Sequence, residues 1–121
     1  MSNQITKQIL EEMIELSVAV IRHVEKSTAH PAIQNQIVRS VTSIGANYSE
    51  AQDASSKRDF VNKIYIAKKE ASETVYWLKL LQKLGDTSED LILFQDKSQR
   101  FVMLLQKIIT STRDKSLQAK G

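Results

Sequence analysis

Apolar residues recur along the chain at spacings of three and four positions, which places them on one face of a helix. Four such rows can be traced, and each predicts a separate helix. The first two rows hold Ile5, Ile9, Met13, Leu16, Val20 and Val24, then Ile33, Ile37, Val41, Ile44, Tyr48 and Ala51. The third and fourth rows hold Phe60, Ile64, Ala67, Ala71, Val75 and Leu78, then Leu93, Phe101, Leu104 and Ile108.

Residues that cap or end helices lie between these rows. Pro31 cannot continue the first helix but suits the first turn of the second. The serines of "DASSK", residues 53–57, offer caps for the third helix, and Gly85 can end it in a left-handed conformation. "DTSED", residues 86–90, offers a cap and first-turn acids for the fourth. Short connections between helices of roughly 20 to 28 residues predict an all-α fold, an antiparallel up-down-up-down four-helix bundle.

Composition supports one small helical protein. A chain of 121 residues suits a single domain over 1–121, with a polar tail from about residue 112 that we expect to fray. The absence of cysteine excludes disulfides, thiol catalysis and thiolate metal sites, and it fits a cytoplasmic location. No stretch approaches the ~20 apolar residues that span a bilayer, and the N-terminus lacks a leader pattern. We therefore expect a protein that is neither exported nor embedded in a membrane.

The predicted third helix carries a second row beside its core row. Spacings of four, three, four and three residues connect Ile66, Glu70, Glu73, Trp77 and Leu80. A helix in a free-standing bundle needs one apolar stripe, so we interpret the second row as a seam between subunits. The alternative is that Trp77 and Leu80 widen the internal core and leave Ile66 as a lone exposed residue.

The second helix contains the unusual stretch "SIGANYSEA", residues 43–51. Gly45 costs about 1 kcal/mol of helix stability relative to alanine, which suggests a packing reason for it. The neighbouring Ser40, Ser43 and Ala46 are also small. Together these residues would allow another helix to approach closely.

Charged and polar residues near these contacts predict a network. Asn47 and Glu50 would lie beside the close contact, where their side chains need hydrogen-bond partners. An isolated buried carboxylate would cost several kcal/mol, so Glu70 and Glu73 should be paired if they face a seam. We expect Arg39, Glu50, Glu70 and Glu73 to form this network, with Arg58 as a further counterpart; the alternative is a solvated charged face.

Positive charge is concentrated in the third helix. The net charge of +3 is too small to indicate nucleic-acid binding by itself, but residues 57–83 hold seven Lys/Arg against three Asp/Glu. Lys57, Lys68 and Lys79 recur every eleven residues and so share nearly one line. Copies in an oligomer would multiply this stripe into a positive ring that attracts phosphates. The candidate nucleic-acid-binding residues are Lys57, Arg58, Lys63, Lys68, Lys69, Lys79 and Lys83.

Two other interpretations of this helix remain open. The lysines could merely solubilise the edge of the core, with their tips in water. Tyr65 and Tyr76 could stack on bases only if they face outward, and we expect at least one of them to pack inside.

Patterns typical of enzymes are weak. His23 and His30 are the only histidines, and neither has a carboxylate or second imidazole three or four residues away. Glu70 and Glu73 lack the Glu-x-x-His motifs that di-iron bundles carry on two helices. No phosphate-binding glycine loop or nucleophile elbow occurs. We expect no enzymatic activity, no metal and no cofactor.

The same region carries a family resemblance. "SVTSIGANYSEAQDASSKRDFVNKIYIAKKEASETVYWLKLLQKLG", residues 40–85, resembles the signature of the family of four-helix-bundle proteins encoded by intervening sequences in bacterial 23S ribosomal RNA genes. The matching positions are Arg39, Ser43, Ile44, Asn47, Glu50, Phe60, Ala67 and Glu73. The glycine-arginine pair that often follows the family glutamate is replaced here by "AQDASSKR".

The resemblance implies a non-enzymatic homopentamer. One branch of the family is similar to the accessory protein of diversity-generating retroelements, a pentameric barrel with basic surfaces that partners a reverse transcriptase and nucleic acid. The implied partners are thus the chain itself, RNA or DNA, and a reverse transcriptase or other protein. The alternative is a structural or protein-interaction bundle that binds no nucleic acid.

Overall fold

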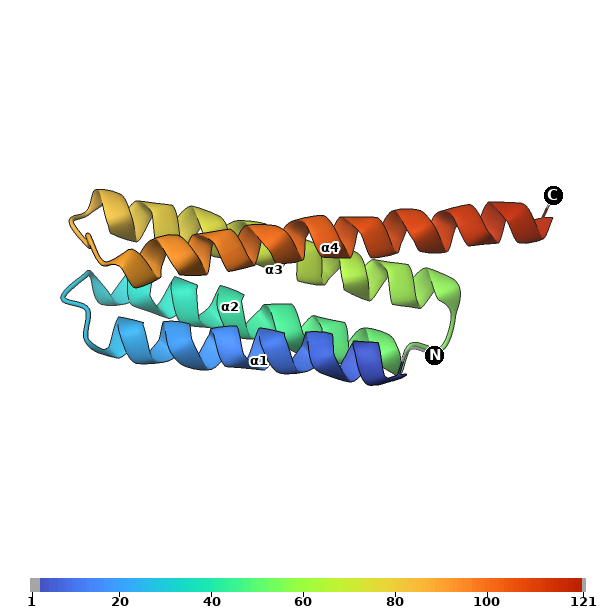
Figure 1. Ribbon diagram of the computed structural model, residues 1–121, viewed down its shortest axis with the longest axis horizontal. Helices are drawn as coiled ribbons and strands as arrows, with labels where there is room; N and C mark the ends of the chain where they lie inside the picture. The colour runs from blue at the N-terminus through green and yellow to red at the C-terminus, as the bar shows by residue number, and fades with distance from the viewer. Residues whose placement is uncertain (1–2, 121) are drawn as a thin grey trace.

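The protein is an antiparallel four-helix bundle, which confirms the predicted fold class (Figure 1). The computed structural model describes the backbone of residues 3–120 and the side chains of residues 4–115. Its helices are α1 (Asn3–Glu25), α2 (Pro31–Gln52), α3 (Lys57–Lys83) and α4 (Glu89–Lys120). The α1–α2 and α3–α4 loops lie at one end of the bundle, and the α2–α3 loop lies at the other.

The helix boundaries follow the predicted local signals. Pro31 occupies the first turn of α2, and Ser56 caps α3 by accepting a hydrogen bond from the Asp59 amide at 3.0 Å. Gly85 follows the end of α3 with a φ of 120°, which a residue with a side chain rarely adopts. The backbone of α4 continues as a helix through Lys120, and the fraying of the polar tail from about residue 112 stays a prediction. No glycine or proline interrupts that stretch, so its polarity alone did not mark a helix end.

The core lies between the four helices. The first three predicted rows are largely inward, but Ile5 of α1 is 62% exposed. The predicted row of α4 is correct only in part. Phe101 is buried, and Leu104 and Ile108 pack against the core. Leu93 is 48% exposed, and the other buried positions are Leu91, Phe94, Leu105 and Ile109. Apolar residues lie on more than one face of α4, so spacing alone could not select the buried one.

The helices do not contact one another equally. Helices that follow each other along the chain pack extensively, with α3 placed between α2 and α4, whereas α1 and α4 contact each other only weakly. α4 also extends beyond the other helices at its C-terminal end (Figure 1). This arrangement leaves α3 with two packed flanks and one side facing outward.

Candidate functional site

An ion-pair cluster joins α2 to one flank of α3. The guanidinium of Arg39 donates to both carboxylate oxygens of Glu70, at 3.2 and 3.3 Å, and to those of Glu73, at 3.3 and 3.4 Å. Gln36 accepts a further hydrogen bond from Arg39 Nε at 3.2 Å. The hydrogen bond to Glu70 is the main cause that raises the pKa of Arg39 above its ordinary value. One arginine thus bridges two carboxylates that lie a turn apart on α3.

A buried polar contact lies beside this cluster. The hydroxyl oxygens of Thr74 in α3 and Ser40 in α2 are 3.0 Å apart, and both residues are fully buried. Each hydroxyl also lies within hydrogen-bonding distance of a carbonyl of its own helix, that of Glu70 for Thr74 and that of Ile37 for Ser40. Because their partners are inside the protein, these hydroxyls need no water in the core.

The polar network is smaller than the sequence predicted. The structure brings Arg39, Glu70 and Glu73 together, but Glu50 instead accepts a hydrogen bond from Lys63 at 3.2 Å, so its predicted place in the network is wrong. Eleven residues separate Glu50 from Arg39 on α2, or about 16.5 Å at 1.5 Å per residue, which is too far to share partners. Asn47 donates to the Ser43 carbonyl of its own helix at 2.9 Å.

The second row of α3 lies on this same flank. Ile66, Trp77 and Leu80 are all partly buried within a single protomer, and Trp77 packs against the core. For Trp77 the structure therefore supports the alternative of a widened core, and Ile66 is not a lone exposed residue. The indole Nε1 of Trp77 is buried without a hydrogen-bond partner among the described side chains, and we have no physical account of it. A seam between subunits along this row stays a prediction.

The outward side of α3 holds most of the candidate cations. Lys57, Arg58, Lys69, Lys79 and Lys83 are exposed. Lys63 and Lys68 are half-buried, and both donate hydrogen bonds. Lys63 donates to Glu50, and Lys68 donates to the Gln106 amide oxygen of α4 at 2.6 Å. We call the following set the outer α3 face: Arg58, Tyr65, Lys69, Tyr76, Lys79 and Lys83.

Both tyrosines lie on the outer α3 face. Tyr65 is 46% exposed and Tyr76 is 60% exposed, so the expectation that at least one packs inside is wrong. The buried positions of α3 are Ile64, Ala67, Ala71, Thr74, Leu78 and Leu81. The small residues among them let the neighbouring helices close over this side, and the tyrosines remain on the other.

No carboxylate of α3 belongs to the outer α3 face. Every side chain of α3 is described, and its acidic residues are Asp59, Glu70 and Glu73. Asp59 lies in the first turn, where its carboxylate accepts from the Ser55 amide at 3.4 Å. Glu70 and Glu73 are held by Arg39 on the α2 flank. Among the described side chains, none of the cations of the outer α3 face forms a salt bridge, although Glu73 is 45% exposed and lies one helical turn after Lys69.

A separate apolar groove of about 330 Å³ runs between α1 and α2. Its lining includes Leu10, Ile14 and Val18 of α1, and Ile14 and Val18 are 47% and 42% exposed. Gly45 lies at the α1–α2 contact, where an added Cβ would be 3.4 Å from Met13 Cβ. Gly45 thus allows a close approach by α1 of the same chain, whereas Ser40 faces Thr74 of α3. The signal for this groove in the sequence is the spacing of Leu10, Ile14 and Val18, which follow one another every four residues; none of the four predicted apolar rows includes them.

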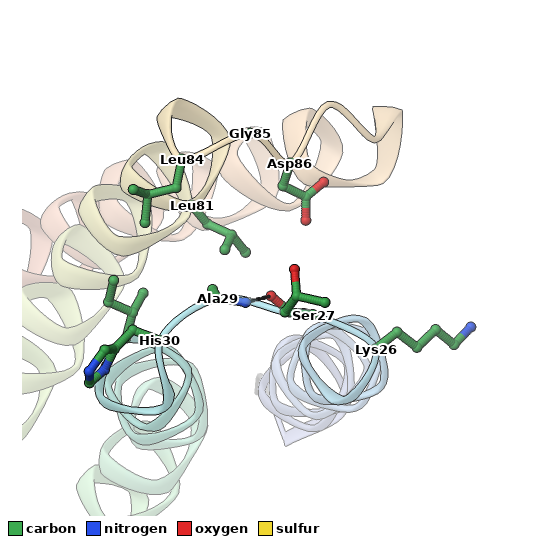
Figure 2. Close-up of a pocket in the computed structure, with 10 residues that line it drawn as sticks. Lys26, Ser27, Ala29, His30, Leu81, Leu84, Gly85 and Asp86 are labelled. Atoms are coloured by element: carbon green, nitrogen blue, oxygen red, sulfur yellow. Dashed lines mark hydrogen bonds between the residues drawn. The ribbon is translucent and has the colours of Figure 1, made fainter.

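A pocket of about 490 Å³ lies at the end of the bundle that holds the α1–α2 and α3–α4 loops, between the α1–α2 loop and the end of α3 (Figure 2). Several of its polar groups, those of Ser27, His30 and Asp86, have protein partners. Ser27 Oγ accepts from the Ala29 amide at 3.0 Å, and His30 Nδ1 accepts from the Ala32 amide at 3.1 Å. Figure 2 shows the side chains of Lys26 and His30 extending away from the space between the loops.

Asp86 of this pocket connects α1 to the α3–α4 loop. Its carboxylate lies 2.6 Å from His23 Nε2 and accepts from the Ser88 hydroxyl, also at 2.6 Å. Burial favours the neutral form of Asp86, but the hydrogen bonds from Ser88 and His23 outweigh it, so the pKa of Asp86 is lowered. Within the described part of the chain, no group of three potential metal ligands occurs, and no helix is long and apolar enough to cross a membrane.

Comparison with known proteins identifies the family. The sequence model of the 23S rRNA-intervening sequence proteins matches residues 6–111. The chain belongs to this family. A crystal structure of a protein of unknown function from the S23 ribosomal protein family, from Bacteroides thetaiotaomicron VPI-5482, is 35% identical, with a TM-score of 0.77. The similarity covers 84% of this chain and 97% of that one. A search of curated proteins gave no match.

For a member of the 23S rRNA-intervening sequence protein family, the outer α3 face is the surface with the most distinct chemistry. Its cations come from one helix, they are exposed, and two exposed tyrosines lie among them. The other hollows of the surface differ in chemistry. The α1–α2 groove is apolar, a hollow between α1 and α4 carries both Glu12 and Arg100, and a larger one of about 670 Å³ mixes apolar side chains with Lys107.

Proposed function

We propose that this protein is a non-enzymatic homo-oligomer that binds nucleic acid electrostatically through the outer α3 face. The observation that carries the proposal is the distribution of charge on α3: its carboxylates are bonded to Arg39 or to the Ser55 amide, and the cations of the outer α3 face form no salt bridge among the described side chains. Phosphate oxygens are the natural partners of such exposed lysine and arginine side chains. In an oligomer, each copy would add its own outer α3 face.

The proposed assembly is a pentamer, in line with the family likeness, and the surface of the protomer supports self-association. Exposed apolar side chains lie along the α1–α2 groove and on α4, where Ile92 and Met103 are 51% and 65% exposed. Contiguous exposed apolar surface often marks a protein contact. The likeness to the accessory protein of diversity-generating retroelements adds a reverse transcriptase as a proposed protein partner in the cytoplasm.

Light scattering of the purified protein tests the assembly. We expect a mass several times that of the 13.7 kDa chain, and we expect Ile14→Glu to lower it by placing a charge in the α1–α2 groove. Leu84→Glu is the matched control, because Leu84 is 59% exposed in the loop after α3 and outside the groove. A monomer at micromolar concentration would overturn the oligomer proposal. Trp77→Glu is a poor test, because Trp77 packs against the core and a charge there would unfold the protomer.

Titration of labelled RNA and DNA at several salt concentrations tests nucleic-acid binding. We expect affinity to fall with salt, with a log-log slope of about −0.7 to −0.9 per phosphate contact, because each contact releases a counterion. No binding at tens of micromolar protein in low salt would instead favour the second candidate. That candidate is a structural or protein-interaction bundle, and the apolar α1–α2 groove is the observation that favours it.

A further inference from the structure

We propose that the outer α3 face selects single-stranded nucleic acid, with bases stacked on Tyr65 and Tyr76 and phosphates bound by the lysines around them. This inference rests on the proposed nucleic-acid binding and specifies its ligand. The chemical class is an unpaired polynucleotide, either RNA or DNA, since both offer exposed base faces and a charged backbone.

The spacing of the tyrosines suits such a ligand. Eleven residues separate Tyr65 from Tyr76, which is close to three helical turns, so both rings project from nearly the same line of α3. The rise of 1.5 Å per residue places them about 16.5 Å apart along the axis. A stacked strand with a spacing of 3.4 Å per nucleotide would cover that distance with about five nucleotides.

Each ring has a neighbour that limits its orientation. Lys68 Nζ lies 5.7 Å from the centroid of the Tyr65 ring, and the same amine is held by Gln106 of α4. The Tyr76 ring stands nearly perpendicular to Trp77, with centroids 5.1 Å apart and an interplanar angle of 78°. Trp77 in turn packs against the core. The tyrosines are therefore exposed side chains with fixed supports, which lowers the entropy lost when a base stacks on them.

Cations alternate with the tyrosines along the same face. Lys69 lies between the two rings, and Lys79 and Lys83 follow Tyr76 toward the end of α3. A single strand presents bases and phosphates side by side, so one strand can use both kinds of contact. A duplex keeps its bases stacked inside, so it can use only the cations. This difference is the physical source of the proposed selectivity.

The test compares short labelled oligo(U), oligo(dT) and a mixed-sequence duplex of equal length, by fluorescence anisotropy at one low salt concentration. We expect Tyr65→Leu and Tyr76→Leu each to weaken binding of the single strands about tenfold and to leave duplex binding unchanged. Tyr65→Phe and Tyr76→Phe keep the ring and should stay within about twofold of the unmodified protein, since stacking uses the ring face. Comparable loss with oligo(U) and oligo(dT) is expected, because stacking does not read the sugar.

A lysine variant separates stacking from charge. Lys69→Gln should weaken single strands and duplex alike and reduce the salt slope by about one contact for each protomer that touches the strand. The leucine variants should leave that slope unchanged. Circular dichroism should show native helicity in every variant, because Tyr65 and Tyr76 are exposed.

The outcomes distinguish this inference from the function on which it rests. If duplex and single strands bind equally and the leucine variants have no effect, the stacking inference is overturned and electrostatic binding stands. If no nucleic acid binds, the proposed function fails and the inference fails with it. Loss of duplex binding in the leucine variants would also contradict stacking, because it would point to a general effect of the substitutions on the face.

Discussion

Charged side chains on the two sides of α3 have different surroundings. On the flank toward α2, Glu70 and Glu73 are both bound by Arg39, and the Glu70 side chain is only 15% exposed. On the outward side, Lys69, Lys79 and Lys83 are exposed. The net positive charge of residues 57–83 is therefore not spread around the helix. It is presented to solvent on one side, because the opposing helix supplies a partner for the acids on the other.

The comparison shows why the charge of a helix is a poor guide to its surface potential. Successive residues turn by about 100°, so Lys69 and Glu70 are neighbours in sequence but face different surroundings. Glu70 meets Arg39 of α2, and Lys69 meets water. Pairing with Arg39 offsets part of the negative charge on the α2 flank without changing the composition of α3.

Removing positive charge from the outer α3 face should have the largest effect, a loss of nucleic-acid binding. We expect the triple variant Lys69→Gln, Lys79→Gln, Lys83→Gln to weaken nucleic-acid binding by about 100-fold or more in low salt, because each lost phosphate contact forgoes counterion release. Salt-dependent titration should show both the loss and a smaller slope.

A control with the same change in net charge sharpens this test. Lys26, Lys97 and Lys107 are exposed lysines outside α3, and replacing all three by glutamine removes an equal charge. We expect binding within a few-fold of the unmodified protein, since long-range charge contributes less than contact. Equal loss in the two triple variants would mean that net charge, and not the outer α3 face, controls binding.

Removing Arg39 from the ion-pair cluster should lower the stability of the fold and leave nucleic-acid binding unchanged. Arg39→Ala leaves Glu70 partly buried without its partner, and we expect a loss of about 1 to 2 kcal/mol in the free energy of unfolding. The loss is limited because Arg39 is 47% exposed and water screens its charge. Urea unfolding measures it, with Arg22→Ala on the exposed surface of α1 as the control, expected within about 0.5 kcal/mol. Equal effects of the two substitutions would show that the ion-pair cluster adds no stability.

Acid should lower the stability of the fold by a smaller amount, because it protonates Asp86, which pairs with His23 near the end of α3. The folded protein lowers the pKa of Asp86 below its ordinary value of 3.8, so the charged carboxylate stabilises the fold. That contribution is complete above the unfolded pKa and is lost as pH falls through the folded pKa. Thermal unfolding between neutral and strongly acidic pH should show the loss, and Asp86→Asn should flatten this part of the curve. An unchanged curve for Asp86→Asn would assign the acid sensitivity to other carboxylates.

Much of the fold could be predicted because its signals are local. Pro31 begins α2, Ser56 caps α3, and Gly85 ends α3 with a positive φ, each through the chemistry of its own residue and its close neighbours. Apolar spacing found the inward faces of the first three helices for the same reason. The family likeness also came from one continuous stretch of sequence, and the match over residues 6–111 bears it out.

The candidate site depended more on tertiary structure. The sequence predicted that Arg39 pairs with Glu70 and Glu73, and the structure contains these pairs. The sequence also placed Glu50 in this network, but in the fold Glu50 accepts a hydrogen bond from Lys63. Spacing likewise could not select the buried face of α4, where apolar residues occur on several sides.

The chain by itself thus determined where each helix begins, where the first three helices end and which residue types each helix face carries. Only the packing of α2 and α4 against α3 decided that Trp77 lies against the core while Tyr76, one residue earlier, faces outward. The physical reason is the distance along the chain over which each interaction acts. Caps, turns and helical periodicity act within a few residues, whereas burial and pairing depend on which other helix covers a face.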